Sequence, residues 1–167
     1  MPRETSSLLA GRNKAPLNSG EIRRASNVFL GLDATVSARY DANSETAFRL
    51  VTGEPGGEYG EIVFGPDIYP GSSVVDPNSA LSLDAAAAHE LTHYHRWRDK
   101  AEIKDDRLMH VDEALTSLQA ISRYEHRLNK TDRRLLVADA ILRLNLYLQE
   151  IASAASTVDD GLSERIT

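Results

Sequence analysis

The chain has 167 residues, of which 41% are hydrophobic and 26% charged, with a formal net charge of −6 and no cysteine. This length fits one domain, and the apolar content predicts a packed core. The negative charge disfavours nucleic acid as the primary partner, because such binding depends on neutralising phosphates. Without cysteine the chain has no disulfides and no thiolate metal site, so a transition metal must be held by histidine and carboxylate.

Residues 1–17 are polar and interrupted by Gly11 and Pro16, which predicts a flexible N-terminal arm. Their apolar stretch is too short for a signal peptide. No segment of the chain approaches the ~20 apolar residues that cross a membrane. We therefore expect a cytoplasmic protein with no membrane partner.

A single domain is expected over residues 18–156. Asn18 and Glu21 have the spacing of a capping box, and apolar residues at helical spacing predict a helix over 19–38. Two short runs rich in β-branched and aromatic residues, 46–52 and 59–64, flank a glycine-rich segment and predict a hairpin. Residues 67–77 contain two prolines, so we expect a loop there with one short edge strand at 73–75.

The rest of the chain is predicted to be helical. Ser79 or Ser82 caps a helix that ends near residue 100, a second helix spans about 105–129, and a third spans about 131–155. Apolar residues almost all around the third helix predict that it is buried, and residues 157–167 are expected to form a frayed tail. The fold class that follows is α+β, with a small antiparallel or mixed sheet and a buried C-terminal helix.

The first of these helices carries the motif H-E-x-x-H, formed by His89, Glu90 and His93. Residues four apart lie on one helix face, so both imidazoles can bind one metal ion. Glu90 lies close to that face, where its carboxylate can reach a metal-bound water. A third ligand is needed, and the candidates are Glu113, Asp99 and Asp112.

This pattern resembles the gluzincin metallopeptidases, whose thermolysin-type members place a glutamate ligand at the distance of Glu113 from the second histidine. The helices that follow a small sheet are also similar to the minimal cores of ImmA/IrrE-type regulatory peptidases. The resemblance covers residues 46–128 and departs from the family at two positions. Asp112 replaces the asparagine before the ligand, and Ser117 stands where an aspartate normally hydrogen-bonds a metal-bound histidine.

The resemblance implies a zincin-like fold in which His89, His93 and Glu113 bind Zn²⁺. It also implies hydrolysis of a peptide bond in a peptide or protein substrate, with Glu90 as the general base. The metzincin pattern would make Asp99 the third ligand. It fits less well, because Arg96 occupies the position of a glycine that ends the helix in a left-handed turn.

Two further parts of the proposed site have several candidates. Donors that could stabilise the oxyanion are Tyr124 and His110, with His126 and Tyr147 as further choices. An edge strand that aligns the substrate would be Glu61–Phe64 or residues 73–75. The alternative function is a non-catalytic zincin-fold binding or regulatory module, with or without a structural metal, that acts through the basic segment 123–134 or the N-terminal arm.

Overall fold

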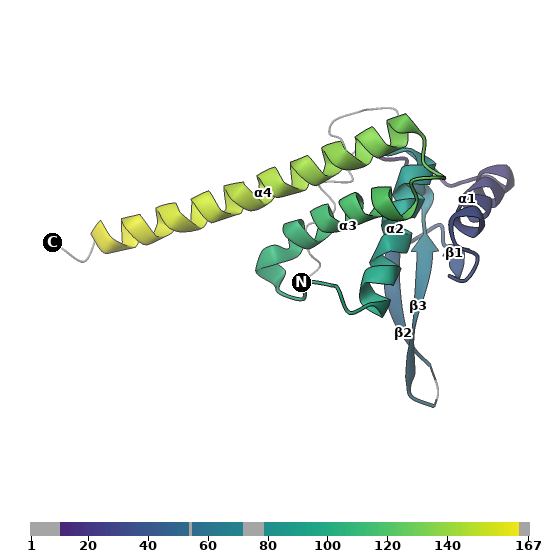
Figure 1. Cartoon of the computed structure of the whole chain (residues 1–167), viewed down its shortest axis with the longest axis horizontal. Coiled ribbons are helices and arrows are strands. Elements are labelled where there is room, and N and C mark those ends of the chain that lie inside the picture. The colour runs from purple at the N-terminus through teal and green to yellow at the C-terminus, as the bar shows by residue number, and fades with distance from the viewer. Residues whose placement is uncertain (1–10, 54, 72–78, 164–167) are drawn as a thin grey trace.

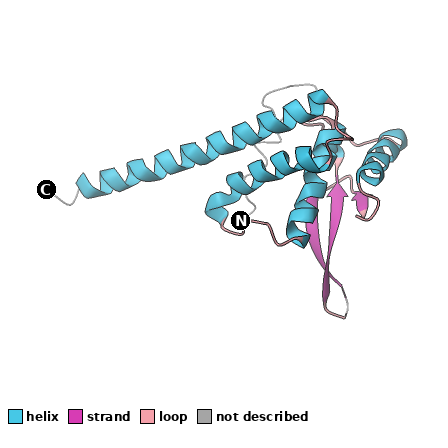
Figure 2. Cartoon of the chain, in the orientation of Figure 1, coloured by secondary structure: helices cyan, strands magenta, loops and turns pink. Residues whose placement is uncertain are grey.

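The computed structural model describes residues 11–53, 55–71 and 79–163, with side chains up to residue 157. Within this part the fold is α+β, as predicted, with four α-helices and one three-stranded mixed sheet (Figures 1 and 2). In chain order the elements are α1 (Ser19–Leu32), β1 (Ala38–Tyr40), β2 (Ala47–Gly53), β3 (Gly57–Phe64), α2 (Leu83–Arg98), α3 (Met109–Arg123) and α4 (Lys130–Ser163). Short 3₁₀ turns, Pro66–Ile68 and Asp106–Leu108, precede α2 and α3.

Helix α1 begins as the sequence predicts and ends earlier. The Asn18 side chain accepts the Glu21 N–H at 2.9 Å, and the Glu21 carboxylate accepts the Asn18 N–H at 2.8 Å, which completes the capping box. The helix ends at Leu32, not near residue 38, because Asp33 accepts hydrogen bonds from both the backbone N–H and the hydroxyl of Thr35. After this turn the chain continues into β1.

The sheet has the order β1-β3-β2. The predicted hairpin is confirmed: β2 and β3 pair antiparallel from Ala47 opposite Val63 to Gly53 opposite Gly57, and β1 adds to β3 in parallel. The expectation that Glu61–Phe64 is an edge strand is wrong, because these residues belong to the central strand. In the described sheet β2 is an edge strand, and the other candidate edge strand, 73–75, lies outside the described residues.

The core fills the space between the sheet, α1 and α2. Phe29 of α1 and Phe64 of β3 are fully buried with ring centroids 5.5 Å apart, and Leu91 of α2 is buried as well. Four consecutive alanines, residues 85–88, are also buried, so their small side chains let α2 approach its neighbours closely. Helices α3 and α4 pack on α2 and on each other (Figure 1).

Helix α4 is not the buried central helix that its composition predicts. Leu136 and Ala140 face the domain and are buried, but Val137, Ile141 and Leu148 are 41%, 55% and 60% exposed. Helices α2 and α3 cover only one face of α4, and Figure 1 shows the far end of α4 extending away from the body of the molecule. The helix runs to Ser163, through much of the segment predicted as a frayed tail. Among the described helices, none combines the length and the apolar character required to span the bilayer.

Residues 11–17, predicted as part of a flexible arm, pack against the domain instead. The buried guanidinium of Arg12 donates to the carbonyl oxygens of Ile68 at 2.8 Å and Leu81 at 2.9 Å. Leu17 joins the hydrophobic core. These contacts attach the segment to the loop that precedes α2, while residues 1–10 of the predicted arm lie outside the described residues.

Candidate metal centre

Helix α2 presents the two motif histidines on one face. It begins at Ser82, one of the two predicted caps, whose hydroxyl accepts the Ala85 N–H at 3.2 Å. His89 is buried and His93 half-buried, and their Nε2 atoms lie 3.1 Å apart. The i, i+4 spacing on a regular helix is sufficient to produce this convergence.

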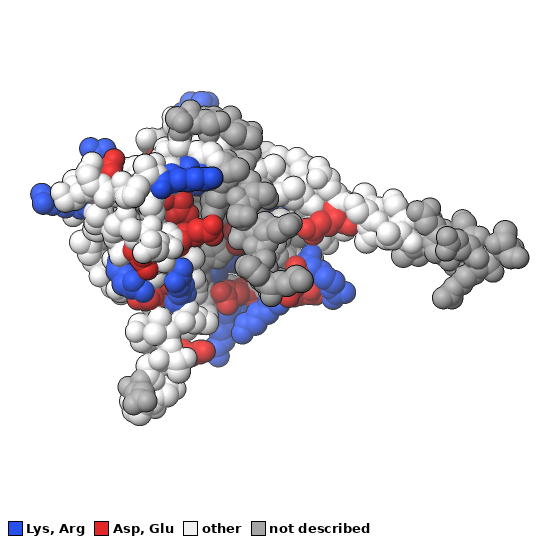
Figure 3. Space-filling model, turned by 180° about the vertical axis from the view of Figure 1, so that it is seen from behind, with Lys and Arg blue, Asp and Glu red and all other residues white. Residues whose placement is uncertain are grey.

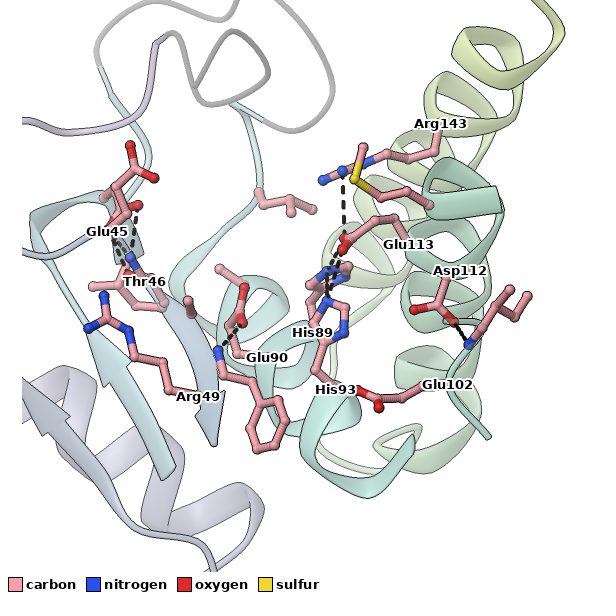
Figure 4. A pocket seen from close by; sticks show the side chains of 18 of the residues that line it. Glu45, Thr46, Arg49, His89, Glu90, His93, Glu102, Asp112, Glu113 and Arg143 are labelled. Carbon is pink, nitrogen blue, oxygen red and sulfur yellow. Dashed lines mark hydrogen bonds and ion pairs between the residues drawn. The ribbon is translucent and has the colours of Figure 1, made fainter. Parts of the chain in front are cut away.

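Glu113 of α3 completes a group of three potential ligands. Its Oε2 lies 3.1 Å from His89 Nε2, and its Oε1 lies 3.4 Å from His93 Nε2 (Figure 4). One donor atom from each of the three residues lies within 4.8 Å of the others. Among the three candidates for the third ligand, the structure brings Glu113 to the histidines.

The donor set suits a transition metal. Two imidazole nitrogens and one carboxylate oxygen are the ligand types of catalytic zinc sites that keep one position open. Bonds of about 2.0–2.1 Å at tetrahedral angles would separate such ligand atoms by roughly 3.4 Å. The observed separations of 3.1 and 3.4 Å are close to this value. These residues can therefore hold a metal ion without rearrangement of their helices.

The charges of the cluster favour a cation. Burial alone would raise the pKa of Glu113, but the charge of His93 and hydrogen bonds from both histidines hold that pKa well below its usual value. Burial alone would lower the pKa of His93, but the charge and hydrogen bond of Glu113, helped by the charge of Glu90, raise it to about 9. In the metal-free protein a proton on His93 therefore supplies the positive charge that the carboxylate attracts.

A buried hydrogen-bonded chain orients His89. The Ser117 hydroxyl donates to Asp139 Oδ2 at 2.6 Å, so its oxygen accepts the hydrogen bond from His89 Nδ1 at 2.9 Å. Ser117 and Asp139 are both fully buried. This contact fixes the orientation of the His89 ring, so that its Nε2 faces Glu113 Oε2 at 3.1 Å. Asp139 of α4 is therefore connected to His89 through the Ser117 hydroxyl.

Arg143, one helical turn after Asp139, connects this chain to Glu113. Its Nε lies 3.4 Å from Asp139 Oδ1 and its Nη1 lies 3.6 Å from Glu113 Oε2. Figure 4 shows the side chain directed from α4 toward Glu113. Our sequence predictions did not include Asp139 or Arg143. The sequence feature that could have identified them is their spacing: two charged residues lie four apart on a leucine-rich helix, which is typical of a polar site on a buried face.

Glu90 lies on the side of the two histidines that faces the sheet, away from Glu113 (Figure 4). Its Oε2 accepts the backbone N–H of Phe48 in β2 at 3.1 Å (Figure 4). Burial raises the pKa of Glu90, and the charges of Glu113 and Asp67 add to this effect. The Phe48 ring packs on Tyr94 and Trp97 of α2, with centroids 6.1 and 5.6 Å away, which fixes β2 beside the helix that carries the motif.

A pocket of about 820 Å³ opens over these groups. Residues 45–49, at the start of β2 and just before it, line one side, while the loop before α3 lines the other. The pocket is also lined by the three potential ligands, by Glu90 and by Arg143. As far as the described residues show, the site is therefore open to a molecule much larger than water and bordered by the edge strand β2.

The two rejected ligand candidates have other roles in the structure. Asp99 ends α2 at the surface, where it pairs with Arg98 at 3.0 Å and Arg123 at 3.7 Å. Asp112 accepts hydrogen bonds from the buried Arg96 and from the Ile103 N–H, the latter at 2.9 Å. Asp112 thus holds the loop before α3, and neither carboxylate belongs to the cluster of potential ligands.

The predicted oxyanion donors do not line the pocket. Tyr124 follows the last residue of α3, where its hydroxyl is buried and this burial raises its pKa. His110 pairs with Glu150 of α4 at 3.1 Å. His126 is exposed, and Tyr147 likewise lies away from the pocket. Arg143 does line the pocket, and its Nη1 lies 3.6 Å from Glu113 Oε2.

Comparisons of the chain with protein-family models, with curated proteins and with solved structures find no match in any of the three.

Proposed function

We propose that this protein is a zinc-dependent metallopeptidase with a gluzincin-type ligand set and a zincin-like fold. The observation that carries the proposal is the convergence of His89, His93 and Glu113 in an open pocket, with Glu90 adjacent to them. A zinc ion bound by these three residues would supply Lewis acidity and lower the pKa of water toward about 7. The chain's own residues provide the remaining parts of a hydrolytic site.

Glu90 is the general base of this proposal. Its Oε2 is held by the Phe48 N–H, which leaves Oε1 to accept a proton from the attacking water and to pass it to the leaving amine nitrogen. Burial raises the pKa of Glu90 toward neutral pH, and a group that both takes and gives a proton works best when its pKa is near the working pH. The fixed backbone contact keeps this carboxylate beside the histidines.

The edge of β2 is the proposed substrate-binding strand. In the described sheet its outer edge has no partner strand, and residues 47–49 line the pocket. An extended peptide can add through backbone hydrogen bonds to the groups of this edge other than the Phe48 N–H, which Glu90 already accepts, and such pairing aligns it without demanding a particular sequence. A peptide or protein segment is therefore the substrate class that suits both the pocket and the neighbouring site.

The proposal is tested by separating metal binding from hydrolysis. The Glu90→Gln variant is expected to bind one zinc ion per chain and to hydrolyse an unstructured protein substrate at least about 100-fold more slowly than the wild type. His93→Ala is expected to lose both zinc and activity, because it removes a ligand. Metal content is measured by atomic emission, and hydrolysis by the appearance of new amino termini.

Two outcomes would overturn the proposal. One is a wild-type protein that binds no zinc, and the other is hydrolysis that survives Glu90→Gln unchanged. Zinc bound without any hydrolysis would favour the alternative, a non-catalytic module with a structural metal.

A further inference from the structure

The face of α4 turned away from the metal centre carries a row of large apolar side chains. Val137, Ile141, Leu144, Leu148 and Ile151 are between 39% and 60% exposed, and we call these five residues the α4 seam. Their spacing alternates between four and three residues. A repeat of seven residues keeps one stripe facing a partner helix in a left-handed coiled coil, whereas packing on a globular domain does not require it.

The repeat continues to the end of the helix. The same four–three alternation next reaches Ala155, Val158 and Leu162 in the sequence, and α4 runs to Ser163. From Val137 to Leu162 the pattern covers about three and a half heptads, which is long enough for a two-stranded coiled coil.

Among the described residues, the outer part of α4 has little to pack against beyond the contact between Glu150 and His110 of α3. Every residue from 148 to 157 is exposed, and Figure 1 shows this part of the helix continuing past α3 into solvent. Helices in water derive most of their stability from packing an apolar face rather than from intrinsic propensity. A helix that packs along the seam would supply this stabilisation.

The charges along α4 favour an identical helix as the partner. The positions that flank the seam are uncharged: Ala138, Ala140, Asn145, Tyr147, Ala152 and Ala154. The charged residues between 135 and 158 are Asp139, Arg143 and Glu150, and all three make contacts with α3. Two copies can therefore meet along the seam without repulsion between like charges.

Other kinds of partner fit this face less well. A helix that lies on a membrane surface carries lysine and arginine around its apolar face, and the exposed face of α4 has neither between residues 135 and 158. In Figure 3 the described surface of the projecting helix that faces the viewer is mostly white, neither basic nor acidic. A strongly charged partner would find no complementary groups there. We propose that two copies of the chain pair through the α4 seam as a two-stranded coiled coil.

The test is the mass of the full-length protein in solution at increasing concentration, by sedimentation equilibrium. The chain has a mass of 18.4 kDa, so the wild type is expected to approach about 37 kDa, twice that value. The double variant Leu144→Glu/Leu148→Glu places charges in the seam and is expected to remain at the monomer mass. The matched control, Gln149→Glu/Ser153→Glu, adds the same charge at exposed positions outside the seam and is expected to dimerise like the wild type.

Three results would overturn the proposal. A wild type that stays at 18.4 kDa up to a concentration of about 100 μM has no such interface, because even a weak specific dimer would have formed at that concentration. A seam variant that still dimerises would place the interface elsewhere, and a control variant that becomes monomeric would show a general effect of charge. Because the wild-type measurement needs no substitution, the test holds even if the seam variant fails to fold.

Discussion

Replacement of Asp139 by asparagine tests whether α4 supports the metal centre. The asparagine oxygen can still accept the Ser117 hydroxyl, but the hydrogen bond loses its charge, and the amide nitrogen faces Arg143 Nε, another donor. The His89 ring is then held less firmly with its Nε2 toward the site. Removal of such supporting contacts typically weakens metal binding 10–100-fold, or about 1.4–2.8 kcal/mol.

The same helix offers a matched control in Asp132. It is also a buried aspartate, and it accepts hydrogen bonds from the Ser82 hydroxyl and from the Asn129 N–H at 3.1 Å. Asp132→Asn and Asp139→Asn should each lower the free energy of unfolding of the metal-free protein, by about 1.5–3 kcal/mol for a hydrogen bond to a charged group. Only Asp139→Asn is expected to weaken zinc binding.

The assay is competition for zinc with a chromophoric chelator, next to denaturant unfolding of the metal-free proteins. The reasoning is refuted if Asp139→Asn binds zinc as tightly as the wild type. It is also refuted if Asp132→Asn loses as much affinity, because the effect would then follow general destabilisation and not the contact with Ser117.

Three further predictions concern the ligand set and its charges. Glu113→Gln should weaken zinc binding at least about 100-fold, whereas Asp99→Asn should leave it unchanged, since Asp99 lies at the surface; the reverse order in the chelator assay would exclude Glu113 as the ligand. Asp112→Ala should lower the free energy of unfolding by about 3 kcal/mol, because buried Arg96 loses its ion pair, while zinc affinity falls much less; equal losses would make Asp112 part of the site. In the metal-free protein the raised pKa of His93 contributes stability that is complete below pH 6.5 and is lost as the pH rises through about 9. Denaturant unfolding from pH 6 to 10 should show this decrease in the wild type, and a His93→Gln variant with the same pH profile would contradict the assignment.

Local features of the chain could be predicted because short-range physics determines them. The capping box at Asn18, the cap at Ser82 and the glycine-rich hairpin depend on neighbours within a few residues. The convergence of His89 and His93 follows in the same way from the geometry of one regular helix. These predictions needed no knowledge of how the helices pack.

Features that depend on packing between distant segments could not be predicted. Hydrophobic periodicity describes how apolar a face of α4 is, but not whether another element covers it, so the seam was predicted to be buried. Asp139 and Arg143 reach the site only because α4 returns antiparallel to α3. The oxyanion donors were chosen by residue type alone, and Tyr124 and His110 have the right chemistry at the wrong place.

The contacts that α4 makes with α3 determine how short a fragment can be if it is to keep the three potential ligands in place. All three potential ligands lie between residues 89 and 113, so a fragment that ended after α3 would contain every one of them. Such a fragment would expose the buried Ser117 and leave Glu113 without its neighbouring guanidinium. Transplantation of the candidate metal site onto another scaffold would therefore require α2 together with the helix pair α3 and α4, and a cut before residue 143 would separate the potential ligands from Arg143.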